Sequence, residues 1–374
     1  MKFTCNRQTL LDALTIAGRA TSSRTTMSIL ECVLLTVDEE SGITLTGNDK
    51  ELCITTAAIQ AEVERGGSAA LDAKLFTEIV RKLPGENITI ETDSNFKATC
   101  MSGRSFLNIS GLPADDFPLL PQEDLTGTAH RYTIKATALR DLIRQTIFSV
   151  SLDQGKKILT GELLDIKNNL LQFVAIDMFR IAYKSEFLGE DTPDAKAVIP
   201  ARALNELARI LPGDEESEIK FCFTEKRAVF ESGSFTLVSS LLSGDFIRYE
   251  QIFNEDFSTM VVINKAPLLS AFERIMLMAG ENRSITAKLE ITDDDMKITA
   301  QSDKGNADDG ILCSTDGKDL TIYFNPRYFI DALRVIDDEQ VNLKFNTQMS
   351  PCTIKGSDAD CKYKYLIVPL RPPA

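Results

Sequence analysis

Two kinds of hydrophobic pattern alternate along this 374-residue chain. In six segments the apolar residues recur every three or four positions, and this spacing predicts amphipathic helices. In one segment the apolar positions are Leu139, Leu142, Ile143, Ile147 and Val150. The predicted helices span 6–20, 72–83, 136–150, 200–211, 265–279 and 325–336. Between them, short runs such as 42–46 and 163–166 alternate apolar and polar residues, and their turns are rich in Asp, Asn, Gly or Lys, which is typical of strands.

The predicted elements recur at a nearly constant interval. The tripeptide Leu-Pro-Gly ends two helical segments at Gly85 and Gly213, which lie 128 positions apart. Three strand-like runs end in Asp49, Asp177 and Asp303, at intervals of 128 and 126 positions. Several landmarks at one shared spacing indicate an internal repeat. We therefore predict three domains, at residues 1–125, 126–253 and 254–374.

Each predicted domain holds two helices in fixed slots of a strand-rich segment. An early helix is followed by strand pairs, a second helix and further strands. This order predicts an α+β fold, in which two helices pack on one face of an antiparallel sheet. With 43% hydrophobic and 26% charged residues, the chain can build sizeable cores of this kind.

The charge is distributed unevenly between these elements. The net charge is −14 and the isoelectric point is about 4.8, which taken whole argues against a simple nucleic-acid binder. The six predicted helices nevertheless hold 13 basic and 7 acidic residues, so they carry +6 and the rest of the chain carries −20. The helices and the sheets therefore differ in the sign of their charge.

The second predicted helix of each domain carries two basic residues seven positions apart. Seven residues make about two helical turns, so each pair lies on one helix face, opposite an apolar face. The pairs are Lys74 with Arg81, Arg202 with Arg209, and Arg327 with Arg334, and Arg140 with Arg144 form a similar stripe on an earlier helix. A solvated face without a partner is the alternative for any single helix, but three equivalent helices favour a ligand. If similar domains line up side by side, their helices would form a basic inner wall that attracts DNA phosphates without reading bases.

Enzymatic and metal sites find little support in the sequence. His130 is the only histidine, just before an expected strand at 132–134, so a histidine-rich metal site is excluded. The glycine-rich phosphate loop, the dinucleotide fingerprint and the nucleophile elbow have no match. Eight cysteines are scattered singly, which predicts free and mostly buried thiols in a reducing compartment. No apolar run approaches the roughly 20 residues of a membrane helix, and the start of the chain lacks the apolar stretch of a signal peptide. We predict no catalytic residue, no metal and no cofactor.

Short motifs in a fixed order run through the whole chain. They begin with Met1-Lys2-Phe3-Thr4 and include Thr26-Met27-Ser28-Ile29-Leu30, Leu45-Thr46-Gly47-Asn48-Asp49, Ser102-Gly103-Arg104-Ser105, Leu112-Pro113-Ala114-Asp115-Asp116-Phe117-Pro118, Asp177-Met178-Phe179-Arg180, Val198-Ile199-Pro200-Ala201-Arg202, Phe324-Asn325 and Tyr365-Leu366-Ile367-Val368-Pro369-Leu370-Arg371. With these motifs the chain resembles the bacterial sliding clamp, the β subunit of the replicative DNA polymerase III. Each motif is weak alone, and their order across three repeats carries the resemblance.

The resemblance implies a head-to-tail homodimer of six similar domains, a closed ring around duplex DNA without sequence specificity. It implies no catalytic activity. The ring would tether the DNA polymerase III catalytic subunit, other polymerases and repair proteins through short peptide motifs, and a clamp loader would open and place it. The location would be cytoplasmic and nucleoid-associated. By position, Arg24, Lys156 and Lys157 would lie near DNA. The full predicted DNA-facing set is Arg24, Lys74, Arg81, Arg140, Arg144, Lys156, Lys157, Arg202, Arg209, Arg274, Arg327 and Arg334.

The resemblance also implies a partner-peptide pocket between the second and third domains. Its residues here would be Leu159, Ile176, Met178, Phe179, Arg180, Ile181, Ile247, Ile252, Leu366, Val368, Pro369, Leu370 and Arg371, with Asn325 and Tyr328 on the rim. The apolar run at 365–370, next to the chain end, independently suits a strand with part of an apolar face free for a peptide, and an ordinary last strand packed on its sheet is the alternative. At the dimer interface, Phe106 and Leu107 would face Leu277 and Met278 of the other subunit, although both pairs also fit a domain core.

The sequence departs from the family at the expected pocket. Met178 and Phe179 stand where a small residue and a His or Tyr are usual, and Ile247 and Gln251 replace a proline and a basic residue. The pocket becomes more apolar, which leaves open its preferred peptides and whether this is a housekeeping or a specialised second clamp. Two rival functions remain. One is a scaffold that binds proteins only, which charge reversal of Arg202 and Arg209 would not affect, and the other is an enzyme that uses carboxylates alone.

Overall fold

The computed structural model describes residues 1–22, 25–119, 130–253, 256–279, 285–357 and 361–372. The same order of elements recurs three times along these ranges. The first repeat contains β1 (Lys2–Asn6), α1 (Arg7–Ala17), β2 (Cys32–Asp38), β3 (Gly42–Asn48), β4 (Leu52–Thr56), β5 (Glu62–Arg65), β6 (Gly67–Asp72), α2 (Ala73–Lys82), β7 (Asn87–Thr92), β8 (Lys97–Ser102) and β9 (Ser105–Leu112).

The second and third repeats follow the same plan. The second contains β10 (Tyr132–Lys135), α4 (Ala136–Arg144), β11 (Gly161–Lys167), β12 (Leu170–Ile176), β13 (Arg180–Phe187), β14 (Ala195–Pro200), α5 (Ala201–Ile210), β15 (Glu218–Phe223), β16 (Arg227–Glu231) and β17 (Phe235–Ser240). The third contains β18 (Thr259–Asn264), α6 (Lys265–Met276), β19 (Ala287–Ile291), β20 (Asp295–Ser302), β21 (Gly305–Leu312), β22 (Ser314–Gly317), β23 (Leu320–Phe324), α7 (Pro326–Val335), β24 (Gln340–Phe345), β25 (Cys352–Gly356) and β26 (Tyr363–Ile367).

All six predicted helices are present, and the predicted α+β class is confirmed. The helix predicted over 136–150 ends at Arg144, and a short 3-10 turn covers Ile147–Ser149. Side-chain oxygens cap the N-termini of several of these helices. Asn6 accepts from the backbone N–H groups of the first turn of α1, and Asn325 does the same for α7, where Pro326 occupies the first helical position. Such caps satisfy backbone donors that have no partner inside the helix.

The strands form antiparallel sheets that continue from one repeat into the next. A 13-stranded sheet has the order β10-β15-β16-β17-β4-β3-β2-β6-β9-β8-β7-β1-β5, a nine-stranded sheet has the order β14-β11-β12-β13-β26-β25-β24-β18-β22, and a four-stranded sheet has the order β21-β20-β19-β23. The last strand of the second repeat, β17, pairs with β4 of the first, and β26 of the third repeat pairs with β13 of the second. Backbone hydrogen bonds therefore join each repeat to its neighbour in the chain.

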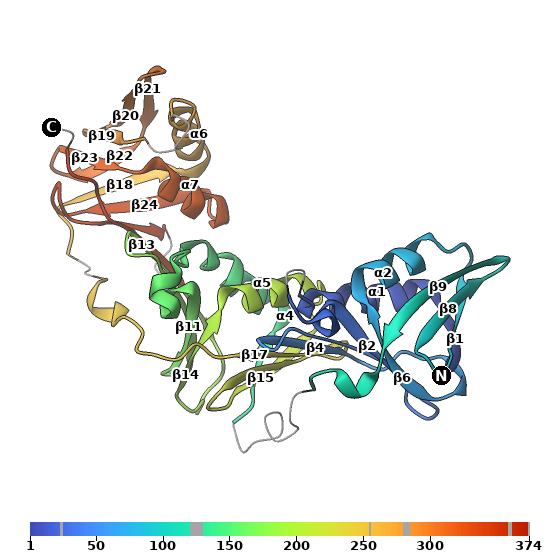
Figure 1. The fold of residues 1–374 in the computed structure, drawn as a ribbon. Helices are drawn as coiled ribbons and strands as arrows, with labels where there is room; N and C mark the ends of the chain where they lie inside the picture. The colour runs from blue at the N-terminus through green and yellow to red at the C-terminus, as the bar shows by residue number, and fades with distance from the viewer. Residues whose placement is uncertain (23–24, 120–129, 254–255, 280–284, 358–360, 373–374) are drawn as a thin grey trace. The chain divides into compact units, whose positions relative to one another are not determined.

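Contacts divide the chain into two compact units. One unit holds Met1–Thr137 and Arg202–Leu241, and the other holds Ala138–Ala201 and Leu242–Ala374. In the first unit, α1 and α2 lie side by side over the strands of the first repeat (Figure 1). In the second unit, α6 packs beside α7, with the rings of Phe272 and Phe329 stacked at 4.6 Å between centroids. The apolar faces of these helices are buried against the sheets, which leaves their basic faces exposed. Every helix in the described ranges is too short or too polar to cross a lipid bilayer.

Candidate nucleic-acid interface and partner pocket

The second helix of each repeat presents the predicted basic residues to solvent. Lys74 and Arg81 are exposed on α2, Arg202 and Arg209 on α5, and Arg327 and Arg334 on α7. The same helices carry a carboxylate four residues after the first basic residue and three before the second. These carboxylates are Glu78, Glu206 and Asp331. The spacing is that of helical neighbours, so each acid can reach a base on its own helix.

Most of the exposed arginines on these helices are already paired with a carboxylate. Arg81 pairs with Glu78, and Arg209 Nη1 lies 3.0 Å from Glu206 Oε1. Arg202 pairs with Asp49 at the start of the β3–β4 turn, and Arg334 Nη2 lies 2.7 Å from Glu273 of α6. For Lys74 and Arg327 the described residues contain no such ion-pair partner. The Arg81–Glu78 and Arg334–Glu273 pairs are exposed on both sides, and such pairs contribute about 0 to 1 kcal/mol each and exchange readily, whereas Asp49 and Glu206 are largely buried. Neighbouring carboxylates therefore offset much of the positive charge of these helical faces.

The remaining residues predicted to face DNA lie in different surroundings. Arg140 is half-buried, and Arg274 of α6 pairs with Asp309 of β21. Lys156 and Lys157 are exposed in the 3-10 segment Gln154–Thr160, where Lys156 Nζ lies 3.1 Å from Met178 Sδ. Arg24 lies outside the described residues. The set thus includes exposed helical residues, loop lysines beside the predicted pocket, and arginines already used in internal contacts.

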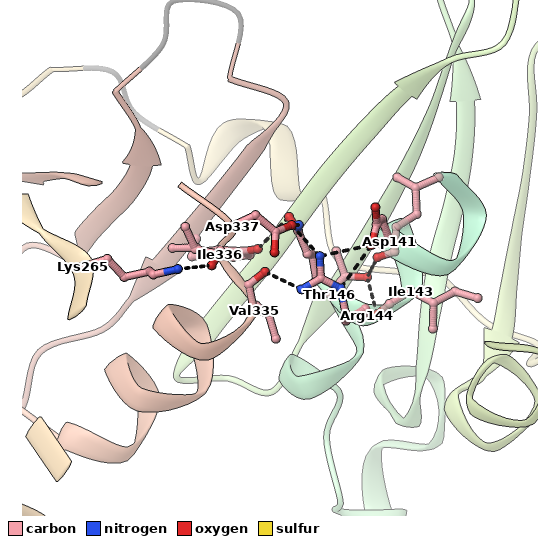
Figure 2. A network of polar contacts seen from close by, with 11 residues as sticks. Asp141, Ile143, Arg144, Thr146, Lys265, Val335, Ile336 and Asp337 are labelled. Atoms are coloured by element: carbon pink, nitrogen blue, oxygen red, sulfur yellow. Dashed lines mark hydrogen bonds and ion pairs between the residues drawn. The ribbon is translucent and has the colours of Figure 1, made fainter. Parts of the chain in front are cut away.

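Arg144 takes part in a polar network at the C-terminal ends of α4 and α7 (Figure 2). Its Nη2 lies 2.5 Å from Asp337 Oδ2, its Nη1 donates to the carbonyl of Val335 over 3.0 Å, and its Nε donates to Asp141 over 3.1 Å. Lys265 Nζ donates to the carbonyl of Ile336 over 2.7 Å. Arg144 and Lys265 thus donate to carbonyls at the C-terminal end of α7 that have no partner inside the helix. The helix dipole also favours positive charge at this end.

This network stabilises the charged form of the Asp337 carboxylate. Burial alone raises its pKa, but the hydrogen bond and the charge of Arg144 outweigh burial, so the pKa of Asp337 lies below its usual range. Gln145 Nε2 also donates to the same oxygen over 2.9 Å. Arg144 therefore joins the second repeat to the third, a role that its spacing from Arg140 does not reveal.

Several residues predicted for the partner pocket gather in one apolar cluster. The buried members of the cluster are Leu159, Leu163, Val174, Ile176, Ile181, Val198, Tyr249 and Leu366, and Val368 packs against them. Beside the cluster, Met178, Phe179, Ile247 and Ile252 expose apolar side chains to solvent. Pro369 and Leu370 are half-buried, Arg371 is exposed, and the half-buried Asn325 caps α7. Exposed apolar groups next to a packed apolar base can receive an apolar peptide anchor.

Arg180 organises one side of this region. Its Nε lies 2.8 Å from Asp177, its Nη1 lies 2.6 Å from Asp331 of α7, and its Nη2 donates to the carbonyl of Phe148 over 2.7 Å. The guanidinium also lies over the rings of Phe148 and Tyr328, at 5.4 and 4.8 Å from their centroids. Because these partners satisfy most of its donors, Arg180 fixes the shape of the site and contributes little free charge to it.

Aromatic packing extends this side of the region. The ring of Phe179 stacks on that of Tyr328, with 6.1 Å between centroids and 16° between planes. Burial raises the pKa of the Tyr328 hydroxyl, and the charge of Asp177 raises it further. Tyr328 therefore stays neutral at physiological pH and offers an aromatic face with a polar edge.

Met178 has an unusual backbone conformation. Its φ is +81°, in the left-handed region that side chains other than glycine rarely adopt. This strain accounts for the small residue that the resemblance leads one to expect here. The chain instead keeps a methionine, which exposes an apolar, flexible side chain beside the predicted pocket.

A cavity of about 130 Å³ adjoins the pocket residues Ile252 and Leu366. Its other lining residues are Asp256, Lys344, Phe345, Asn346, Ser350, Pro351 and Thr353. Sequence reasoning missed these residues, which come mainly from β24, β25 and the turn between them. Their hairpin directly precedes the apolar run at 365–370, and this adjacency was the available signal. They add a polar wall to an otherwise apolar region.

The residues predicted for the dimer interface lie on or beside unpaired strand edges. Phe106 and Leu107 are exposed on β9, which pairs with β6 at Gly111 and Leu112, and no other described strand covers that edge of Ser105–Ser110. β21 is the edge strand of the four-stranded sheet. Leu277 is exposed, and Met278 is half-buried. Open strand edges with apolar side chains can pair with another chain.

His130 and the cysteines, which are common catalytic residue types, lie where nothing in the described structure activates them. His130 is exposed and lies edge-on to Tyr132, 4.8 Å between ring centroids. All eight cysteines are free and six of them are buried, as predicted. Burial raises the pKa of Cys5 and Cys100 to about 12, so their thiols stay protonated and unreactive. In the described part of the chain, no group of three or more His, Cys, Asp or Glu is placed to hold a metal ion.

Three models of one family match consecutive segments of the chain. They describe the N-terminal domain of the DNA polymerase III β subunit at residues 1–121, its central domain at 133–247 and its C-terminal domain at 250–371. Two curated relatives named beta sliding clamp, from Halalkalibacterium halodurans and Bacillus subtilis strain 168, are each 31% identical, over 386 and 384 residues. Each alignment covers 99% of this chain and 100% of the relative.

Solved structures resemble the chain over its whole length. A crystal structure assigned to a DNA polymerase III β subunit from Eubacterium rectale ATCC 33656 has 38% identity and a TM-score of 0.94. The DNA polymerase sliding clamp from Bacillus subtilis has 30% identity and a TM-score of 0.93, and the Pseudomonas aeruginosa sliding clamp bound to griselimycin has 28% and 0.92. Each match covers 100% of both chains.

Proposed function

The chain belongs to the DNA polymerase III β subunit family of bacterial sliding clamps, and from this premise we propose how its residues perform the work of a processivity clamp. A clamp keeps a polymerase on DNA, and the chain has this function in DNA replication. We propose that it works as a homodimeric ring that encircles duplex DNA without reading its sequence.

The strand edges supply the main support for the homodimer. Within the chain, the last strand of one repeat pairs with the strand that follows the Asp49 or Asp177 turn of the preceding repeat, as β17 pairs with β4 and β26 with β13. Among the strands that the structure describes, two of these types have no such partner: β9, the last strand of the first repeat, and β21, which follows Asp303. In a head-to-tail dimer, β9 of each copy would pair with β21 of the other. This observation is the main support for the proposed ring, because closure of the ring would pair both open strand edges.

The basic helical faces would line the ring. Lys74, Arg81, Arg202, Arg209, Arg327 and Arg334 are exposed there, while most are balanced by a neighbouring carboxylate. Weak attraction to phosphates would let DNA slide, and closure of the ring would supply retention. Arg274, Arg140, Lys156, Lys157 and Arg24 complete the predicted lining, with Arg144 engaged mainly in the network with Asp337.

The apolar cluster around Leu159 and Leu366 would bind short peptide motifs of partners. Its exposed side chains Met178, Phe179, Ile247 and Ile252 would receive apolar anchors, and the cavity beside Ile252 would take a polar neighbour of the anchor. The partners we propose are the DNA polymerase III catalytic subunit, other polymerases, repair proteins and a clamp loader. We also propose that the chain itself has no catalytic activity and works in the cytoplasm, on the nucleoid.

One experiment tests the ring directly. The purified protein would be loaded onto nicked circular DNA with a clamp loader, and its retention measured before and after the circle is cut once. A ring should stay on the circle and leave the linear form by its ends, and electron microscopy should show closed rings with a hole wider than the roughly 20 Å duplex. Equal loss from circular and linear DNA, together with compact monomers, would favour a scaffold that binds proteins only.

A further inference from the structure

Two carboxylates at the same helical position each accept an arginine from the preceding repeat. Arg19, at the end of α1, lies with Nη1 3.0 Å from Glu206 Oε2 of α5. Arg180, at the start of β13, lies with Nη1 2.6 Å from Asp331 Oδ2 of α7. All four side chains are largely buried. Each bridge therefore joins two repeats beside the strands that pair between them.

The two strand junctions have the same register. In the first, Leu52 of β4 lies opposite Ser239 of β17, and in the second Arg180 of β13 lies opposite Ile367 of β26. Leu52 and Arg180 both lie three residues after the aspartate that ends the preceding strand-like run. Because Ser239 and Ile367 also lie at matching positions of the last strand, the two junctions are equivalent residue by residue.

The third carboxylate of this set is Glu78 of α2. Within the described ranges it pairs with Arg81 of its own helix and with no arginine of another repeat, and both side chains are about half exposed. Other side chains on the same surface of the first repeat are also more exposed than their equivalents in the later repeats. Phe106 is 68% exposed, whereas its equivalents Phe235 and Tyr363 are 1% and 7% exposed, and Leu75 is 51% exposed while its equivalent Ala203 is 3% exposed. The first repeat therefore presents an uncovered junction.

The equivalence between the repeats also predicts which strand should pair with β9 at this junction. Asn306 of β21 lies three residues after Asp303, as Arg180 lies after Asp177, and Ser110 of β9 corresponds to Ser239. A second copy would therefore pair with Asn306 opposite Ser110 and Gly310 opposite Phe106. β9 carries no charged residue along this edge, and Asp308 and Asp309 of β21 are already paired with Lys297 and Arg274, so a copy of this chain matches the uncovered surface.

We propose that Glu78 lies at the junction between two copies of the chain and that this junction lacks the arginine bridge found at both junctions inside the chain. The inference rests on the proposed homodimer. The third-repeat positions that correspond to Arg19 and Arg180 hold Leu277 and Asn306, neither of which carries the positive charge that an ion pair with a carboxylate needs. Leu277 and Asn306 are both exposed, as residues at an uncovered junction should be.

The missing bridge makes the junction between copies different in kind from those inside the chain. The internal junctions combine strand pairing, apolar contacts and a largely buried ion pair whose separation would leave charges unpaired. The junction between copies would lack this ion pair, so its parting would leave no buried arginine or carboxylate unpaired at this position. The sequence thereby distinguishes the contact that must open for loading from the two that must not.

Supplying the absent arginine tests the proposal. Asn306→Arg copies the Arg180–Asp331 bridge, and Leu277→Arg copies the Arg19–Glu206 bridge. Either change should slow dissociation of the homodimer about tenfold or more, measured by subunit exchange between labelled copies. Adding Glu78→Gln should remove the gain, and 1 M salt should reduce it, because an ion pair is screened. Asn306→Gln and Leu277→Gln are the matched controls, with a long polar side chain and no charge.

The outcomes separate this inference from the homodimer on which it depends. In one adverse result, the wild-type protein exchanges subunits while neither arginine variant slows the exchange, and in another, Glu78→Gln leaves the slower exchange unchanged. Either result would show that the proposal about the missing bridge is wrong, while the homodimer would stand. If the wild-type protein stays monomeric at tens of micromolar, the homodimer fails and the inference fails with it. Both altered positions are exposed, so one variant remains informative if the other folds poorly.

Discussion

The backbone N–H of Val368 donates to the carbonyl oxygen of Phe179 over 2.8 Å. This hydrogen bond ties the segment after β26 to the turn that precedes β13, and so it joins the two ends of the apolar cluster. A similar bond from Leu370 to the carbonyl of Tyr323, at 2.7 Å, continues the attachment. The proposed pocket is therefore a fixed feature of the second and third repeats, and its residues can be tested singly.

Arg180→Met should lower the free energy of unfolding by roughly 3 kcal/mol, because it leaves Asp177 and Asp331 without their cation in largely buried positions. Urea unfolding measures the loss. Adding Asp331→Leu should restore part of the stability, since the second change removes one of the stranded charges. Two losses that simply add would show that Arg180 and Asp331 do not interact.

Met178→Gly should leave stability unchanged or raise it, because glycine adopts a φ of +81° without the cost of about 1 to 2 kcal/mol that other residues bear. Met178→Ile should lower stability by about 1 kcal/mol, since a branched side chain fits this conformation worst. Met349→Ile is the control at another exposed methionine, which has no positive φ. If both changes at position 178 reduce stability equally, the strain is not what distinguishes them. Met178→Gly should also weaken binding of a partner peptide, measured by fluorescence anisotropy.

Acid should weaken the contact between Arg144 and Asp337. The folded state holds the pKa of Asp337 below its ordinary value of 3.8, so its contribution to stability is present above pH 3.8 and is lost as the pH falls through the lowered value. Asp337→Asn should therefore lower stability at pH 6 and have little effect near pH 2, measured by urea unfolding across this range. Arg144→Gln should give the same profile, and combining the two changes should add little. A deficit that persists unchanged at pH 2 would contradict this account.

Charge reversal on one basic helical face should weaken retention on DNA. Arg202→Glu with Arg209→Glu should speed release from circular DNA about tenfold at low salt, and should reduce the salt dependence by roughly one unit of slope for each lost phosphate contact. Lys2→Glu with Arg65→Glu makes the same change of charge on strands β1 and β5, away from the helical faces, and should leave retention nearly unchanged. Equal effects of the two double variants would mean that total charge matters and the helical faces do not.

Oxidative crosslinking can test the register between copies. Ser110→Cys with Asn306→Cys should form a disulfide between two copies, because opposite residues of antiparallel strands have Cα atoms within about 5.5 Å. Ser110→Cys with Ala307→Cys is shifted by one residue, which turns the second side chain to the other face and should crosslink poorly. Most native thiols are buried, and burial raises the pKa of Cys32 and Cys53 to about 11, so they should compete little. Equal yields from both pairs would contradict the register.

The sequence predicted the helices and the repeat well because both depend on local patterns. The spacing of Leu139, Leu142 and Ile143 reports one buried helix face, and the recurrence of Asp49 and Asp177 reports one turn used twice. The pairing of strands between repeats left no such trace. It depends on which edges meet in space, and one sequence does not show edges.

The candidate site was predicted less evenly. Residues such as Leu159, Ile176 and Leu366, which the resemblance supplied, do gather in one cluster. The sequence analysis did not single out the carboxylates beside the basic pairs, since Glu206 and Asp331 look like ordinary helical neighbours until their partners from another repeat are known. Lys344 and Thr353 were missed for a similar reason, because they reach the cavity from a hairpin whose packing only the fold determines.

The pairing of β26 with both β13 and β25 bears on how the protein is made. A ribosome delivers β13 long before β26, so the growing chain spends most of its synthesis with that strand edge open and the apolar base beneath it incomplete. The apolar cluster that we propose as the partner pocket is thus completed only when β26 reaches β13. A chain released before β26 would lack this pocket, so such a truncated product should not compete with full copies for partner peptides.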